Sequence, residues 1–193
     1  AVKLKEIMEK IRVVLESEKL ANTLSLTDDE QKLVKELHLI TMKPFLYVLN
    51  KQHGGKNFDE MNDGRFEKLL AYFNNNKYHY VVVDAKIEDE LKEFEGEEKD
   101  MMRSELGAKD NGVDALIKAG YRLLSLESYL TTGEMETRAW TIKHGSTAPR
   151  AAAAIHTDFE QKFIRAEVVA YDDLVACGSF QDAKAKGKVR TEG

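Results

Sequence analysis

The stretch KPFLYVLNKQHGG, residues 43–55, decides the fold of the first part of the chain. Pro44 cannot continue a helix, and Phe45–Leu49 is rich in aromatic and aliphatic residues, so we expect a strand directly after the proline. This strand runs into Asn50 and Lys51 and then a loop with two glycines. Polar residues at a strand end followed by such a loop are typical of the ligand-binding edge of an α/β sheet.

The next segments complete a βαβ unit. GRFEKLLAYFNNN (64–76) has helical periodicity, and HYVVVDAK (79–86) is a second short apolar strand. Strand, helix and strand in this order predict two parallel strands with a right-handed crossover. The carboxyl ends of parallel strands share one edge of the sheet. The residues expected there are Asn50 and Lys51 after the first strand, and Asp84, Ala85 and Lys86 after the second.

Helices are predicted on both sides of this unit. Residues 4–15 carry apolar side chains at helical spacing, and Thr27 with Glu30 forms a capping box that opens a second helix. The two predict a helical hairpin, with two ordinary surface helices as the alternative. Charged helical segments over 87–106, a turn at 108–112 and an amphipathic helix over 113–125 follow the second strand.

At about Glu127 the pattern changes to short strands around one helix, which predicts a compact α+β domain. Residues 127–133 and 136–142 form a predicted hairpin, with Gly133 and Glu134 near its turn. Pro149 marks a helix start, 163–171 a strand and 172–178 a short helix capped by Gly178. The basic segment 184–193 is expected to be a frayed end.

Composition limits the classes of partner. The net charge is −5 over 193 residues, and 1–130 carry all of it while 131–193 are neutral. This balance argues against tight nonspecific nucleic-acid binding but leaves room for a local RNA contact in the neutral part. No apolar run approaches the roughly 18 residues of a membrane span, so no membrane partner is expected. The single Cys177 excludes an internal disulfide, and we expect a cytoplasmic protein.

The residue types at the predicted sheet edge fit a purine base. An Asn amide both donates and accepts hydrogen bonds, and a Lys stem can cover the flat face of a base. Both residue types are also common at strand ends, which is the plain alternative. The phosphate-binding pattern G-x-x-x-x-G-K-[ST] is absent from the sequence, and HGGKN (53–57) has the wrong spacing and is expected to be a flexible loop.

Other candidate groups give no catalytic set. The five histidines lack metal-ligand spacing, and His156 with Asp158 is more typical of a helix cap than of an acid–base pair. Cys177 has no evident base, and Trp140 is expected to be a sheet residue rather than a stacking platform. We therefore expect no metal site and no catalytic residue within the chain.

A family resemblance rests on the second half of the chain. RAWTI, G-x-T-AP-x-AA, IHTDFE and FIRAEV-x-AYDD occur in order within the roughly 50 residues 130–178, and upstream LTDDEQKLVKELHLITMKPFLYVLN and DAKIEDEL continue the match. These blocks closely resemble the Obg-like ATPases, the YchF family of P-loop NTPases. The resemblance implies a Rossmann-like nucleotide domain, a coiled-coil insertion, a β-grasp (ubiquitin-like) TGS domain, hydrolysis of ATP in preference to GTP, and association with the ribosome or ribosomal RNA.

The resemblance also implies a domain assignment. Residues 1–42 would be the end of the coiled-coil insertion, 43–126 the rear of the Rossmann-like domain, and 127–193 the TGS domain without its last strand. The phosphate loop and Mg²⁺ ligands of the parent protein would precede residue 1. We therefore expect ATP and Mg²⁺ in the full-length parent, none bound to this chain, and no hydrolysis by the chain alone.

Site residues carry over by position. Asn50 matches the base-reading asparagine, Lys51 flanks the base, and Asp84-Ala85-Lys86 matches the family's Ser-Ala-Lys turn with Asp in place of Ser. The family's base-reading motif is Asn-x-x-Glu, and true GTPases have Asn-Lys-x-Asp. In this sequence the fourth position of the motif is His53, which differs from both. Guanine selection needs a carboxylate that accepts from two N–H groups, so His53 argues against guanine, unless Asp59 or Glu60 substitutes.

A second hypothesis is a nucleotide-independent RNA or ribosome adaptor, and a stand-alone hydrolase is a distant third. The adaptor would use basic residues of the C-terminal part to contact phosphates. The candidates are Arg138, Lys143, Arg150, Lys162 and Arg165.

Overall fold

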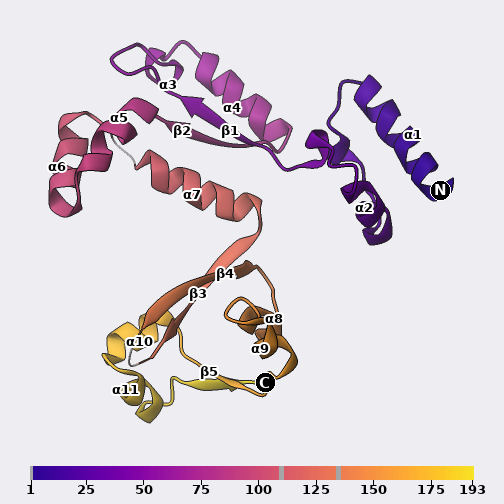
Figure 1. Cartoon of the computed structure of the whole chain (residues 1–193). Helices are drawn as coiled ribbons and strands as arrows, with labels where there is room; N and C mark the ends of the chain where they lie inside the picture. The colour runs from indigo at the N-terminus through magenta and orange to yellow at the C-terminus, as the bar shows by residue number, and fades with distance from the viewer. Residues whose placement is uncertain (1, 109–110, 134–135) are drawn as a thin grey trace. The chain divides into compact units, whose positions relative to one another are not determined.

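The computed structural model describes residues 2–108, 111–133 and 136–193 (Figure 1). The chain divides into two compact units, Ala1–Leu124 and Ser125–Gly193, and each unit combines helices with strands. The mixed α/β content predicted from the sequence is therefore confirmed. Part of the predicted turn at 108–112, and Glu134 of the predicted hairpin turn, lie outside the described residues.

The first unit contains a two-stranded sheet and seven α-helices among its described residues. The strands are β1 (Leu46–Asn50) and β2 (His79–Val83). The helices are α1 (Val2–Glu16), α2 (Asp28–Lys35), α3 (Phe58–Met61), α4 (Arg65–Asn75), α5 (Ala85–Glu90), α6 (Gly96–Glu105) and α7 (Gly112–Leu123). Short 3₁₀ turns lie at Ala21–Thr23, Ile40–Met42 and Leu91–Glu93.

The predicted parallel strand pair is confirmed. β1 and β2 run in register from Leu46 opposite His79 to Asn50 opposite Val83. Alternate residues point to opposite faces of the sheet. One face, with Val81 and Val83, packs on Ala119 of α7.

Aromatic side chains cover the other face of this sheet. Tyr47 stacks on Phe73 of α4 with ring centroids 5.1 Å apart, and Tyr80 lies 5.3 Å from the same ring. Figure 1 shows α4 and α7 on opposite sides of β1 and β2. The sheet is therefore the middle layer of an α/β/α arrangement.

The N-terminal helices form a small core of their own. Ile7 and Ile11 of α1 pack with Ala21 and Val34. The predicted capping box is present: the Thr27 N–H donates to Glu30 Oε2 over 2.9 Å, and the Glu30 N–H donates to Thr27 Oγ1 over 3.4 Å. Local sequence signals are sufficient here because both partners lie within one helical turn.

A buried carboxylate joins three helices behind the sheet edge. Glu88 of α5 accepts hydrogen bonds from Arg103 Nη1 of α6 over 2.8 Å and from the Gly112 N–H over 2.7 Å, at the start of α7. Both charged side chains are only 10% exposed. A Cβ at Gly112 would lie 3.0 Å from Val83 Cγ1 and 3.1 Å from Glu88 Oε1, so this close approach favours glycine.

The second unit has four described strands and four described helices. The strands are β3 (Leu126–Thr132), β4 (Thr137–Lys143), β5 (Ala166–Val168) and β6 (Arg190–Glu192), and the helices are α8 (Ala148–Ala152), α9 (Thr157–Gln161), α10 (Tyr171–Cys177) and α11 (Phe180–Ala185). The predicted hairpin is confirmed, with Tyr129 of β3 opposite Trp140 of β4. Pro149 lies in the first turn of α8 and Gly178 caps α10 at φ 79°, both as predicted.

The prediction of a frayed C-terminal end is wrong. Residues 180–185 form α11, and β6 pairs antiparallel with β5, so that Val168 lies opposite Arg190. Lys184 Nζ lies 2.6 Å from Glu167 Oε1 and Lys188 Nζ lies 3.1 Å from Asp173 Oδ1. The basic residues thus have acidic partners distant in sequence, which local composition does not reveal.

We expect Glu88→Ala to destabilise the first unit by about 3 kcal/mol, because it removes a buried partner of a charged group. Unfolding in urea followed by far-UV circular dichroism measures this loss. The single Trp140 lies in the second unit, so its fluorescence transition should not move. Glu90→Ala is the matched control, because its side chain is 42% exposed and contacts Lys86 only at 3.8 Å. Equal effects of the two changes would contradict this account.

The same carboxylate predicts an acid-sensitive first unit. Burial alone would raise the pKa of Glu88, but hydrogen bonds from Arg103 and the Gly112 N–H outweigh it and hold the pKa below 4.5. As pH falls, the Glu88 carboxyl therefore binds a proton in the unfolded state before it does so in the folded state. The stability that Glu88 contributes above about pH 4.5 is lost as the pH falls through the folded-state pKa. We expect Glu88→Gln, which cannot ionise, to lose less stability than the unchanged protein between about pH 5 and pH 3. Urea midpoints over this range provide the measurement, and parallel curves would refute it.

Candidate functional site

The fold brings the predicted base-edge residues together at the ends of β1 and β2. Asn50 is the last residue of β1, and Asp84 follows β2 directly. The Lys51 N–H donates to the Val83 carbonyl over 2.7 Å, which extends the strand ladder by one residue. Asn50 Oδ1 accepts from the Ala85 N–H over 3.0 Å. The two strand ends are therefore tied to each other by main chain and side chain.

The turn after β2 is shaped by Asp84. Its Oδ1 accepts from the Lys86 and Ile87 N–H groups, each over 3.1 Å, and so caps α5. A serine would also cap a helix at this position, so the capping role survives the Asp-for-Ser difference. The aspartate adds a negative charge and a second oxygen. Lys86 itself is exposed, with its Nζ 3.8 Å from Glu90.

Among the described residues, only the oxygen of the Asn50 side-chain amide has a hydrogen-bond partner. Oδ1 is used by Ala85, whereas Nδ2 donates no hydrogen bond to any described residue. This contact fixes the amide orientation and leaves a donor at the edge. A purine N7 is an acceptor that such a donor recognises.

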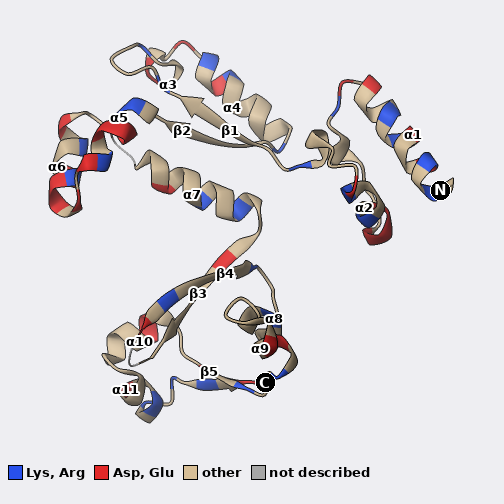
Figure 2. Ribbon diagram, viewed as in Figure 1, with Lys and Arg blue, Asp and Glu red and all other residues tan. Residues whose placement is uncertain are grey.

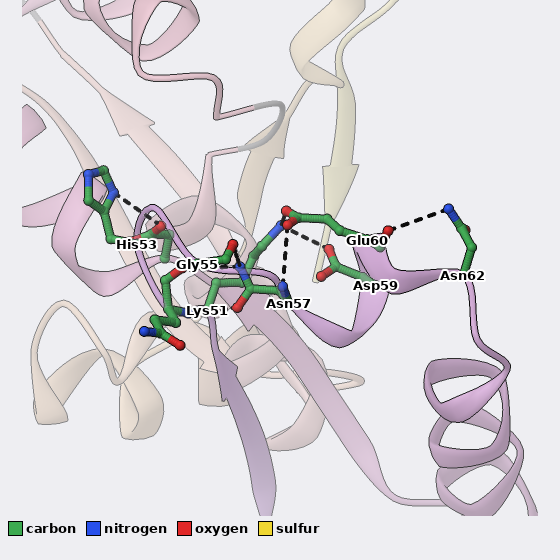
Figure 3. Close-up of polar contacts among 9 residues, drawn as sticks. Lys51, His53, Gly55, Asn57, Asp59, Glu60 and Asn62 are labelled. Carbon is green, nitrogen blue, oxygen red and sulfur yellow. Dashed lines mark hydrogen bonds and ion pairs between the residues drawn. The ribbon is translucent and has the colours of Figure 1, made fainter.

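The loop after β1 is closed by Asn57 rather than open (Figure 3). Asn57 Oδ1 accepts from the Gln52 N–H over 2.7 Å, and Nδ2 donates to the carbonyls of Gln52 and Gly55 over 3.1 and 3.3 Å. Gly54 takes a left-handed conformation with φ 65°, which favours glycine in this turn. Asn57 is not among the residues predicted for this edge, although Asn57 with Glu60 has the spacing of a capping box.

Lys51 is held by two carboxylates of α3. Its Nζ lies 2.9 Å from Asp59 Oδ2 and 2.5 Å from Glu60 Oε1. Partial burial alone would lower the pKa of Lys51, but the bonds to Glu60 and Asp59 outweigh it and raise the pKa. The Lys51 ammonium in turn lowers the pKa of Glu60. The two acidic residues that could have substituted in guanine recognition are therefore engaged with Lys51.

His53 lies against the turn of the second strand. Its Nδ1 is 3.6 Å from Asp84 Oδ2, a contact drawn in Figure 3. The loop after β1 thus meets the turn after β2 a second time, in addition to the Asn50–Ala85 bond.

The basic residues proposed as phosphate contacts are not gathered on one surface. Arg138 and Lys143 of β4 are five positions apart, so they lie on opposite faces of the hairpin. The Arg138 guanidinium covers the Trp140 ring at 4.4 Å, and Lys162 Nζ lies 3.0 Å from Asp158 Oδ2. Arg150 lies on α8 and Arg165 just before β5, both exposed. Figure 2 shows the basic residues of the second unit on separate elements.

The expectations that His156 caps a helix and that Trp140 is a sheet residue are confirmed. His156 Nδ1 accepts from the Asp158 N–H over 3.2 Å and caps α9. Trp140 is half-buried and donates from Nε1 to Thr131 Oγ1 over 2.8 Å. Among the described residues, no group of three or more His, Cys, Asp or Glu side chains is placed to hold a metal ion. No helix in the described part of the chain has the length and apolar character to cross a membrane.

Comparisons with known proteins agree with this architecture. Residues 126–193 match the family model YchF-GTPase_C, described as "Protein of unknown function (DUF933)". The "Ribosome-binding ATPase YchF" of Bacillus subtilis (strain 168) is 50% identical over 188 residues, which are 97% of this chain and 51% of that protein. The protein of the same name from Pasteurella multocida (strain Pm70) is 41% identical over 187 residues, 97% of this chain and 50% of the relative.

A solved structure, that of the Schizosaccharomyces pombe YchF GTPase, superimposes with a TM-score of 0.79 at 30% identity. The match covers 97% of this chain and 50% of that chain. The chain belongs to the YchF family. It spans about half the length of the curated YchF relatives it matches, and its last 68 residues correspond to the C-terminal model of the family.

We expect Asn57→Ala to open the loop after β1, because three hydrogen bonds to Gln52 and Gly55 are lost together. Amide hydrogen exchange of Gln52 should become about tenfold faster or more, corresponding to roughly 1.5 kcal/mol of local stability. Exchange measured by NMR for each residue tests this. Asn74→Ala, an exposed change on α4, should leave Gln52 protected. Unchanged exchange in Asn57→Ala would show that the amide does not close the loop.

Proposed function

We propose that this chain supplies the purine-recognition edge and the C-terminal domain of a ribosome-associated, Mg²⁺-dependent ATPase. The observation that supports it most directly is the Asn50 amide, whose Oδ1 is fixed by the Ala85 N–H while Nδ2 stays available as a donor. Asn50, Lys51 and Ala85 come from two strand ends at one edge, where α/β proteins bind ligands.

The proposed roles follow from the contacts. Asn50 Nδ2 donates to the purine, the Lys51 stem lies along the flat face of the base, and the turn Asp84-Ala85-Lys86 closes the other side. Ion pairs with Asp59 and Glu60 neutralise the Lys51 ammonium and limit its movement. Adenine is favoured over guanine in this proposal, because the fourth position of the base-reading motif is His53 and not a carboxylate.

Phosphate binding and hydrolysis require groups outside this chain. Its sequence has no G-x-x-x-x-G-K-[ST] loop, so ATP, its Mg²⁺ and the reacting phosphates are assigned to the remainder of a longer parent protein. Ribosome association and a cytoplasmic location are proposed from the names of the YchF relatives. In the same proposal, residues 1–42 are the end of a coiled-coil insertion, 43–126 the rear of a Rossmann-like domain, and 127–193 a TGS domain.

A fusion tests the proposal. The part of the Bacillus subtilis relative that this chain does not cover is joined in front of residue 1, and ATP hydrolysis is measured. We expect hydrolysis by the fusion, and a roughly fivefold to tenfold higher KM for ATP in Asn50→Ala, because one ligand hydrogen bond is lost. Asn74→Ala in the same fusion should leave KM unchanged.

The isolated chain should not hydrolyse ATP. Hydrolysis by the isolated chain that persisted in Asn50→Ala would contradict the proposal. A fusion in which Asn50→Ala and Asn74→Ala behaved alike would remove Asn50 from base recognition.

A further inference from the structure

The end of the parallel sheet opposite the base edge differs from that edge in its charge. β1 and β2 start at this end, where Leu46 lies opposite His79. α4 and α7 run against the direction of the strands, so both helices finish here (Figure 1). Residues 37–49, 68–83 and 115–126 contain no Asp or Glu, although the chain as a whole has a net charge of −5. The last turns of α4 and α7 accordingly carry no acidic residue in Figure 2.

Exposed cations lie on these acid-free segments. Lys43 precedes β1, Lys77 lies between α4 and β2, and Lys118 and Arg122 lie one turn apart near the end of α7. Within the described ranges, none of these four side chains takes part in an ion pair. At the base edge, by contrast, Lys51 faces two carboxylates. The end at which the strands start is therefore the electropositive end of the sheet.

Helix termini explain only part of this arrangement. A cation near the last turn of a helix is stabilised by the helix dipole, which would account for Lys77 and Arg122. Lys77, however, takes a left-handed conformation with φ 55°, which favours glycine, so the turn itself does not require a lysine. Lys43 follows a short 3₁₀ turn, and only its carbonyl is bound, by Asn22 Nδ2 over 3.1 Å. The ammonium groups of Lys43 and Lys77 can therefore meet an anionic partner.

An exposed aromatic ring lies in the second half of α4. Tyr72 is 55% exposed and follows the exposed Lys68 by one helical turn. Its ring packs against the buried Phe73 and against Tyr78, with ring centroids 6.2 and 6.0 Å away. Tyr78 in turn lies 5.2 Å from Tyr47 of β1. Neighbouring rings therefore fix the position of Tyr72, while more than half of it faces solvent.

We propose that the electropositive end of the sheet binds a single-stranded segment of RNA, with an unpaired base stacked on Tyr72 and phosphates at Lys43 and Lys77. Sites for single strands combine cations that follow the backbone with aromatic side chains on which bases stack. A duplex keeps its base faces covered, and an acidic peptide would leave Tyr72 without a stacking partner. This surface is separate from the base edge, and the choice of RNA rests on the ribosome association in the proposed function.

The charge distribution limits such binding to one part of the chain. The acidic base edge, with Asp59, Glu60 and Asp84, disfavours phosphates at the other end of the same sheet. In the second unit the basic residues lie on separate elements (Figure 2). We therefore expect weak, salt-dependent binding, in which each phosphate contact contributes about 0.7 to the slope of log K against log salt.

Fluorescence anisotropy of a labelled oligouridine RNA tests the stacking contact. An oligomer of about 12 nucleotides is titrated with the 193-residue chain at about 50 mM salt, and uracil avoids competition by the purine edge. Tyr72→Ala should weaken binding about tenfold, because one stacked base is lost, whereas Tyr72→Phe should stay within about twofold. Tyr171→Ala is the matched control, because Tyr171 is 65% exposed but lies in the second unit, next to Asp172.

A pair of charge variants tests the phosphate contacts. Lys43→Gln combined with Lys77→Gln removes two cations, so the slope of log K against log salt should become shallower by about 1.4. Lys32→Gln combined with Lys92→Gln changes the net charge equally, but these two lysines are paired with aspartates, and the slope should stay the same. Urea midpoints should change little in either pair, which separates a lost RNA contact from a lost structural one.

The outcomes separate this surface from the base edge. Equal binding by Tyr72→Ala and the unchanged chain would overturn the RNA proposal, and so would the absence of binding at about 50 mM salt. Tighter binding of duplex RNA, single-stranded DNA or a polyglutamate peptide than of the single-stranded RNA would also overturn it. Should Tyr72→Ala misfold, the salt slope of the lysine pair still decides.

The proposed function is tested independently of this surface. Tyr72→Ala should leave the KM for ATP of the fusion unchanged, and Asn50→Ala should leave oligouridine binding unchanged. Failure of RNA binding therefore leaves the role of Asn50 standing, and failure of the Asn50 test leaves the RNA surface standing.

Discussion

The Glu88 carboxylate is the constraint on which the geometry of the base edge depends. It joins α5 to Arg103 of α6 and to the first N–H of α7. The first turn of α5 also carries the Ala85 N–H that fixes the Asn50 amide. Because α7 packs on β2 and is tied to α5 through Glu88, the turn after β2 is held in position relative to β1. A two-stranded parallel sheet has little stability by itself, so these helix contacts fix its ends.

Local signals in the sequence were enough for much of the fold. The Thr27–Glu30 capping box, the Gly178 cap and the strand after Pro44 each depend on neighbours within a few residues. The C-terminal strand was missed because β6 is defined by its pairing with β5, more than 20 residues earlier. Arg103 was also not identifiable, since its helix is strongly charged and its burial comes from Glu88 on another helix.

The candidate site also combines features that the sequence predicts with features that depend on contacts it does not reveal. Strand order predicted that Asn50 and Ala85 would meet, because parallel strands share their carboxyl edge. The loop in between was not predictable in detail. Its glycines indicated flexibility, yet Asn57 closes it through bonds to main-chain groups, and Lys51 reaches forward to α3. Side chains that hydrogen-bond to the main chain of a loop leave a weaker signal in the amino-acid sequence than the apolar periodicity of helices and strands does.

The charges at this edge indicate which end of a nucleotide it suits. Lys51 is positive, but Asp59 and Glu60 together exceed its charge, and Asp84 adds a further carboxylate. Lys86 lies toward Glu90. An acidic edge of this kind repels phosphates, which need cations or main-chain N–H groups, and it attracts the amino group of a base. In the proposed function, base recognition and phosphate recognition are therefore separable, and the residues at this edge are assigned to the base.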